Sequence, residues 1–131
     1  MTALDTNVVV RFVVADDAAQ FERAKKFIAD GIAREEQLFI SDIVLCELVW
    51  VLTRAYDYPA PSVIAVLRSL IRAKHIATTD SSALGRALDA FESGKGDFAD
   101  YLIREHAHAA GCAEVVTFDK ALHKEHGFVA A

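Results

Sequence analysis

Short strand-like segments alternate with longer helical patterns along the whole chain, and this alternation constrains the fold most strongly. The segments TAL, QLFIS, HIATT and EVVTF are short and largely apolar, and helix-like stretches separate them. Strands joined through helices run parallel, and the helices then cover the faces of the sheet. The sequence therefore predicts an α/β fold with a short central parallel sheet flanked by helices. A length of 131 residues fits a single domain over residues 1–131.

Capping and breaking residues indicate where the helices begin and end. Helices are expected over 42–56 and 81–93, with another starting at the segment DFADYLI. The expected starts are Asp17, which forms a capping-box pattern with Gln20, then Ser41 and Pro61, and the expected stops are Gly31 and Gly111.

The apolar run VVVRFVV that follows Asp5 fits two structures. Its β-branched residues favour a strand, whereas a cap at Asp5 or Thr6 would begin a short buried helix. Periodicity does not separate these alternatives in so apolar a run.

Composition limits the function classes. The run IVLCELVWVL is interrupted by Glu47 and is too short to span a membrane, and no secretory signal is visible, so a cytoplasmic protein is expected. Cys46 and Cys112 lie in apolar surroundings without zinc-site spacing and are expected to be buried free thiols. A net charge of −5 repels nucleic acid at long range, so binding RNA requires a local basic patch or a bound cation.

Acidic residues occupy the positions where such a sheet places its ligand site. Asp5 follows the first strand and Asp119 the last, whereas Glu47 lies about two turns into the helix after the second strand. Asp97 and Asp100 begin the helix that leads to the last strand. Clustered carboxylates repel one another unless a cation lies between them, and hard oxygen ligands suit Mg²⁺ or Mn²⁺.

Each acid also has a purely structural interpretation. The apolar neighbours of Glu47 predict that it faces the core, where a carboxylate needs a partner, and Arg54 is a candidate for an ion pair. Asp5 and Asp119 are suitable helix caps. Asp97 and Asp100 favour the positive end of a helix, and Arg104 is spaced to pair with Asp100.

Four motifs in order, LDTN, SDIVLCELVWVL, DFADYLI and VVTFDK, resemble the acidic motifs of the PIN-domain nucleases, and most closely those of VapC toxins. The resemblance implies a three-layer α/β/α fold and an endoribonuclease site that uses Mg²⁺ or Mn²⁺. It places catalytic metal ligands at Asp5, Glu47, Asp100 and Asp119, and supporting residues at Asp97, Thr6, Asn7 and Thr117. It also implies RNA substrates such as tRNA or rRNA, a VapB-like antitoxin that lies across the cleft, and a homodimer.

Other functions stay open at this point. A zinc enzyme would use the C-terminal histidines, although their spacing is poor for ligands, and an aspartyl phosphotransferase would use Asp5. A non-catalytic binding module would use the acids as caps or for a basic partner, and a stand-alone PIN nuclease in RNA processing would need no antitoxin. The runs VIAVLRSLI and FERAKKFI are either ordinary core or a partner surface. The histidines are His106, His108, His123 and His126, and the candidate RNA-binding cations are Arg11, Arg54, Arg68, Arg72 and Lys74.

Overall fold

Two units make up the chain in the computed structural model, which describes every residue from Met1 to Ala131. The first unit is Met1–Thr79 and the second is Asp80–Ala131. The single domain predicted over residues 1–131 stays a prediction. None of the helices has the length and apolar content that a membrane-spanning segment needs.

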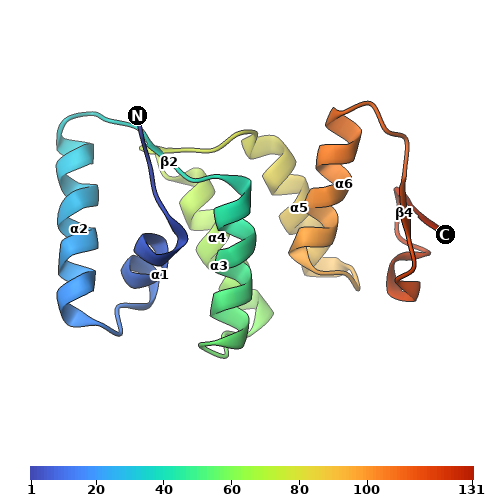
Figure 1. Ribbon diagram of the computed structural model, residues 1–131, viewed down its shortest axis with the longest axis horizontal. Coiled ribbons are helices and arrows are strands. Elements are labelled where there is room, and N and C mark those ends of the chain that lie inside the picture. Colours follow the sequence, from blue (N-terminus) through green and yellow to red (C-terminus); the bar gives the residue numbers. More distant parts are fainter. The chain divides into compact units, whose positions relative to one another are not determined.

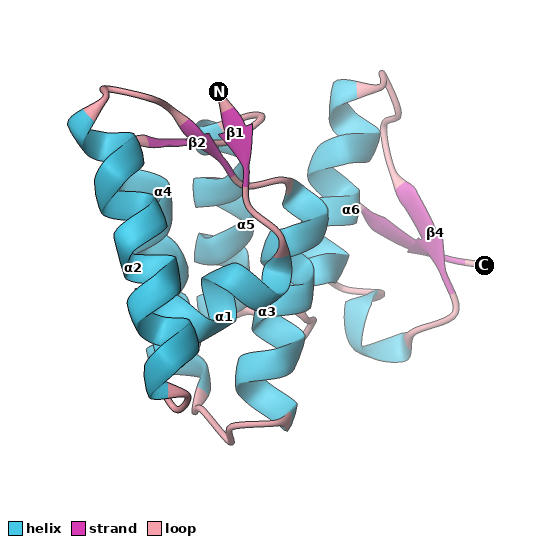
Figure 2. Ribbon diagram, turned by 60° about the vertical axis from the view of Figure 1, so that its left-hand side comes forward, coloured by secondary structure: helices cyan, strands magenta, loops and turns pink.

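The first unit is built on a three-stranded parallel sheet with strand order β1-β2-β3. Thr2 pairs with Leu38, and Leu38 pairs with Ile76, so the strands are in register along their whole short length. Figure 1 follows the chain through these elements, and Figure 2 shows β1 and β2 side by side. The elements are β1 (Thr2–Ala3), α1 (Thr6–Val14), α2 (Ala18–Ala33), β2 (Leu38–Phe39), α3 (Asp42–Arg54), α4 (Ala60–Arg72) and β3 (Ile76–Ala77).

The ambiguous run after Asp5 is a helix, α1, and its cap explains why. The Asp5 carboxylate accepts a hydrogen bond from the Thr6 N–H at 2.8 Å, which satisfies one of the donors left free at a helix start. Val9 and Val10 are buried, so burial overrides the β propensity of the run. The predicted cap at Ser41 is also confirmed, because its Oγ accepts from the Val44 N–H at 3.2 Å.

The predicted helix stop at Gly31 is wrong. Gly31 lies inside α2 and is buried, and a Cβ there would lie 3.4 Å from Cδ2 of Leu38 in β2. The helix ends instead in a Schellman motif, in which Glu35 adopts the left-handed conformation with φ 56° and the Glu36 N–H bonds the Gly31 carbonyl at 2.9 Å. A non-glycine residue, Glu35, therefore takes the left-handed position that ends the helix.

Helix α3 is apolar on two faces, of which one is buried. Leu45, Leu48 and Leu52 are fully buried, whereas Ile43 and Trp50 are 72% and 60% exposed. The sequence predicts a largely buried helix over 42–56. This prediction is wrong for the face that carries Ile43 and Trp50, which is exposed.

The second unit pairs two helices with a small parallel sheet of β4 and β5, in which Val115 lies opposite Phe128. The strand at Phe128–Ala130 is absent from the sequence-based prediction. Buried Phe98 and Tyr101 from the second helix and Leu84 from the first form the centre of its core. The elements are α5 (Ser81–Ser93), α6 (Phe98–Ala109), β4 (Val115–Thr117), the 3₁₀ helix η1 (Lys120–Leu122) and β5 (Phe128–Ala130).

Parallel strands alternating with helices confirm the predicted α/β class.

The two cysteines differ in their exposure. Cys46 is half-buried, and this burial raises the pKa of its thiol, with a smaller contribution from the charge of Asp42. Cys112 is exposed, so its predicted burial is wrong, because the residue follows the end of α6 rather than lying within it.

Replacing Leu67 with alanine should lower the free energy of unfolding by about 2–5 kcal/mol, because this α4 side chain is fully buried and its loss leaves a cavity. Urea denaturation measures the change. Ser69→Ala, an exposed position in the same helix, is the control and should change stability by less than about 0.5 kcal/mol. Equal effects at the two positions would contradict this core.

Candidate active site

The predicted site acids come from both units. Asp5 and Glu47 belong to Met1–Thr79, and Asp97, Asp100 and Asp119 belong to Asp80–Ala131. No group of three or more histidine, cysteine, aspartate or glutamate side chains lies together as a metal site, and the C-terminal histidines form none either. The assembly of the acids into one metal centre therefore stays a prediction.

Asp5 is an exposed N-cap at the end of the link from β1 to α1. Its capping bond uses Oδ1 alone, so the carboxylate has a second oxygen available for a ligand. The next residue, Thr6, is buried, and its Oγ1 has no hydrogen-bond partner. The structural role predicted for Asp5 is thus confirmed, and it is compatible with a chemical one.

Glu47 lies in the middle of α3, which packs against α1. Its predicted burial is wrong, because it lies on the exposed face of the helix with Ile43 and Trp50. The alternative ion pair with Arg54 is absent. Glu47 is therefore a solvent-facing carboxylate without a counter-charge.

Asp97 and Asp100 are joined at the start of α6. The Asp97 N–H donates to Oδ2 of Asp100 at 2.8 Å, which is half of a capping box. The alternative pair of Asp100 with Arg104 is wrong. Arg104 instead donates from Nη1 to the His126 carbonyl at 2.8 Å and lies over the ring of Tyr101, 5.0 Å from its centroid.

The loop before Asp97 is held by the side chains of Tyr101 and Glu125. The Tyr101 hydroxyl accepts from the Gly96 N–H at 3.0 Å and donates to Oε1 of Glu125 at 2.8 Å. The same Oε1 accepts from the Lys95 N–H at 2.8 Å. These contacts fix the backbone that leads into α6, and hence the position of its first-turn carboxylates.

Both glycines of the loop are required by close packing. A Cβ at Gly94 would overlap the Tyr101 hydroxyl oxygen at 2.0 Å. A Cβ at Gly96 would lie 2.6 Å from Cδ2 of Leu122 and 3.2 Å from Oδ2 of Asp100. The glycine-rich segment SGKGD therefore packs tightly against the residues that follow it.

Glu125 was missed by sequence reasoning. Its hydrogen bonds with the Lys95 N–H and then the Tyr101 hydroxyl lower the pKa of its carboxyl group. Its partner Lys95 is 30 residues away in the chain, so no local pattern connects the two.

Asp119 is the N-cap of η1, directly after β4. Its Oδ1 accepts from the Ala121 N–H at 3.0 Å, and its own N–H donates to Oγ1 of Thr117 at 3.0 Å. Thr117 thus fixes the backbone of Asp119, and its supporting role in a metal site stays a prediction. Asp119 is exposed and keeps one carboxylate oxygen outside the cap.

None of the candidate acids has an ion-pair partner, whereas other carboxylates on the surface do. Asp30 binds Lys26 at 2.8 Å and Glu105 binds Arg86 at 2.7 Å. Carboxylates with free oxygens and no basic neighbour match the hard oxygen donors that Mg²⁺ and Mn²⁺ prefer. The donor chemistry of these residues therefore fits such an ion.

Comparison with known proteins gives two matches. A family model for the PIN domain matches residues 2–126. A VapC ribonuclease of Aquifex aeolicus (strain VF5) is 24% identical over 124 residues, which are 95% of this chain and 91% of that protein. The family match spans the candidate acids of both units.

Replacing Glu125 with glutamine should lower stability at neutral pH, and this loss should disappear in acid. Since the folded-state pKa of Glu125 lies below its ordinary value of 4.5, its contribution is full above that value and is lost as the pH falls through the folded pKa. Urea denaturation of both proteins at about pH 7 and about pH 3 tests this.

The exposed Glu114, which has no hydrogen-bond partner, supplies the control variant Glu114→Gln. A stability difference for Glu125→Gln that persisted unchanged at the lower pH would contradict the predicted linkage.

Proposed function

Because the chain belongs to the PIN domain family, we propose that it is an endoribonuclease that hydrolyses RNA phosphodiester bonds with Mg²⁺ or Mn²⁺. The family match and the similarity to a VapC ribonuclease support nuclease activity. The observation that carries the metal-dependent form is the set of carboxylates that have a free oxygen and no basic partner.

The proposed ligands are the carboxylates of Asp5, Glu47, Asp100 and Asp119. When bound, such an ion lowers the pKa of a water molecule and neutralises charge on the displaced oxygen. Hydrolysis of this kind leaves a 5′-phosphate and a 3′-hydroxyl without use of the ribose 2′-hydroxyl.

The remaining site residues have supporting roles. Asp97 donates its N–H to Asp100 and so orients that carboxylate, and Thr117 orients the backbone of Asp119. Thr6 and Asn7 follow Asp5 directly, and the buried Thr6 hydroxyl lacks a hydrogen-bond partner. Asp97 and Thr117 thus position two of the proposed ligands, and Thr6 and Asn7 are proposed to support the third, Asp5.

The two units together make one PIN domain in this proposal, because the family match runs through both of them. The protein is further proposed to be the toxin of a VapBC-type pair, cytoplasmic and dimeric, that cuts tRNA or rRNA and is restrained by a VapB-like antitoxin. The similarity to a VapC ribonuclease over nearly the whole chain supports this. A stand-alone PIN nuclease without an antitoxin is the alternative.

Asp100→Asn should reduce cleavage of a labelled tRNA and rRNA pool by about 100-fold or more, because an amide is a poorer metal ligand than a carboxylate. Its oxygen can still accept the Asp97 N–H, so the capping bond and the fold should be retained. Cleavage rates are measured with Mg²⁺, with Mn²⁺ and with EDTA.

Glu114→Gln, a change at an exposed acid outside the proposed site, should cleave like the unmodified protein. Cleavage that persists in EDTA, or products with 2′,3′-cyclic phosphate ends, would overturn the proposed mechanism. A folded chain without any cleavage would favour the non-catalytic binding module.

A further inference from the structure

A groove of about 700 Å³ adjoins Asp5 within the first unit. One wall comes from the end of β1 and from α1, and the other comes from α2. Asp5 is the sole acid among the residues that line it. Its principal lining side chains are Asp5, Asn7, Val8, Arg11, Arg23 and Phe27.

The α2 wall presents a cation and an aromatic ring one turn apart. Arg23 and Phe27 are separated by four residues, which places them on one side of the helix. Arg23 is exposed, and its guanidinium has no hydrogen-bond or ion-pair partner. Phe27 is 44% exposed, although an aromatic side chain of this size is normally more fully buried.

The other basic side chains of α2 are already engaged. Lys26 pairs with Asp30 at 2.8 Å, and the Lys25 ammonium lies over the Phe21 ring, 5.9 Å from its centroid. Arg23 is therefore the one cation of this helix that is available to a ligand in the groove.

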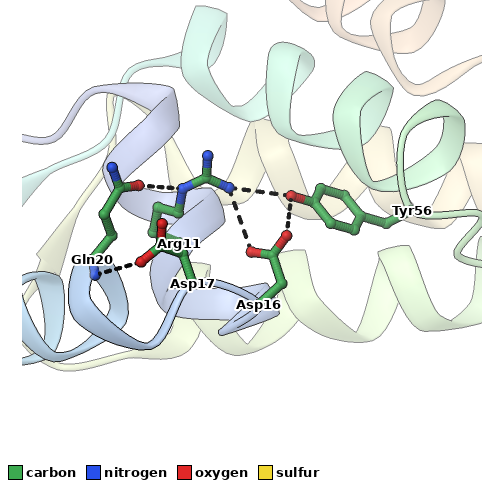
Figure 3. Close-up of polar contacts among 5 residues, drawn as sticks. All are labelled: Arg11, Asp16, Asp17, Gln20 and Tyr56. Carbon is green, nitrogen blue, oxygen red and sulfur yellow. Dashed lines mark hydrogen bonds and ion pairs between the residues drawn. The ribbon is translucent and has the colours of Figure 1, made fainter.

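Arg11, the other guanidinium of the groove, is fixed by its neighbours (Figure 3). Its Nε donates to Gln20, and its Nη1 donates to the Tyr56 hydroxyl at 3.2 Å and to Asp16 at 3.4 Å. The Tyr56 hydroxyl donates to the second oxygen of Asp16 at 2.9 Å. Arg11 thus stabilises the edge of the groove, while Asp16 offsets its charge.

We infer that this groove binds single-stranded RNA beside Asp5, with the Arg23 guanidinium on a phosphate and the Phe27 ring stacked on a base. A chain of net charge −5 needs a local cation to hold RNA, and Arg23 supplies it next to a proposed ligand of the metal. Aromatic stacking with a cation for the backbone is how proteins hold single strands without sequence preference. The inference rests on the proposed function and names the residues that position its substrate.

An apolar protein segment is the competing occupant, and Arg23 argues against it. Laying such a segment over the groove would bury an unpaired guanidinium beside Phe27, which is costly unless the partner brings a carboxylate. An RNA strand brings a phosphate for each nucleotide and satisfies the guanidinium wherever the strand lies.

The test measures binding of a fluorescently labelled single-stranded RNA of about twelve nucleotides by anisotropy, in EDTA and over a range of salt concentrations. Arg23→Gln should weaken binding about tenfold and reduce the slope of log K against log salt by about 0.7, because one phosphate contact is lost. Arg34→Gln, at the exposed C-cap arginine of α2 that does not line the groove, is the matched control and should change neither quantity.

Phe27→Ala and Phe27→Leu should both weaken binding about tenfold with the salt slope unchanged, because neither residue stacks on a base. Phe27 and Arg23 are exposed, so the variants should keep the fold, which circular dichroism checks. Full affinity in Phe27→Leu with loss in Phe27→Ala would indicate apolar contact instead of stacking and would overturn the inference.

Cleavage kinetics separate this inference from the proposed function. A positioning role predicts that Arg23→Gln raises KM with kcat unchanged. If the unmodified chain cleaves RNA and Arg23→Gln has the same dissociation constant and KM, the RNA-binding role of the groove is overturned. The proposed nuclease activity then stands. If RNA binding depends on Arg23 but the chain cleaves no RNA, the groove's role stands and the proposed nuclease activity is overturned. If the unmodified chain binds no RNA, the groove's role is overturned.

Discussion

The hydrogen bond from a backbone N–H at a helix start to a single carboxylate oxygen is the interaction on which the rest of this structure depends. Asp5 makes it at α1 and Asp119 at η1, and Asp100 accepts the Asp97 N–H at α6. Each bond satisfies a donor that the helix leaves free, and each fixes the direction of its acid. Since one oxygen is sufficient for the cap, the other is available for a ligand. Folding and the proposed chemistry therefore share the same residues.

Much of the fold follows from local signals in the sequence. The alternation of short strands with helices gave the α/β class, and the caps at Asp17 and Ser41 were correct because each bond lies within one turn. The error at Gly31 arose because this glycine lies inside α2, and the left-handed position that ends the helix belongs to Glu35, a residue type that does not signal a helix stop. The strand at Phe128–Ala130 was missed because its pairing with β4 is a property of the folded chain.

The candidate site was predictable in its residue types and much less so in its surroundings. The positions of Asp5 and Asp119 after strands, and of Asp97 and Asp100 at a helix start, can be read from the sequence. The absence of an ion pair at Asp100 cannot, because Arg104 has suitable spacing and binds elsewhere. Arg23 was missed because the segment FERAKKFIAD has the charge pattern of an ordinary solvated helix face. Its availability depends on which neighbouring charges are already paired.

The hydrogen bond between Glu125 and the Lys95 N–H forms late during synthesis of the chain. The loop that leads into Asp97 and Asp100 is made early, but the carboxylate that holds it belongs to a residue translated 30 positions later. On the ribosome these two acids therefore lack their support until nearly the whole second unit has emerged.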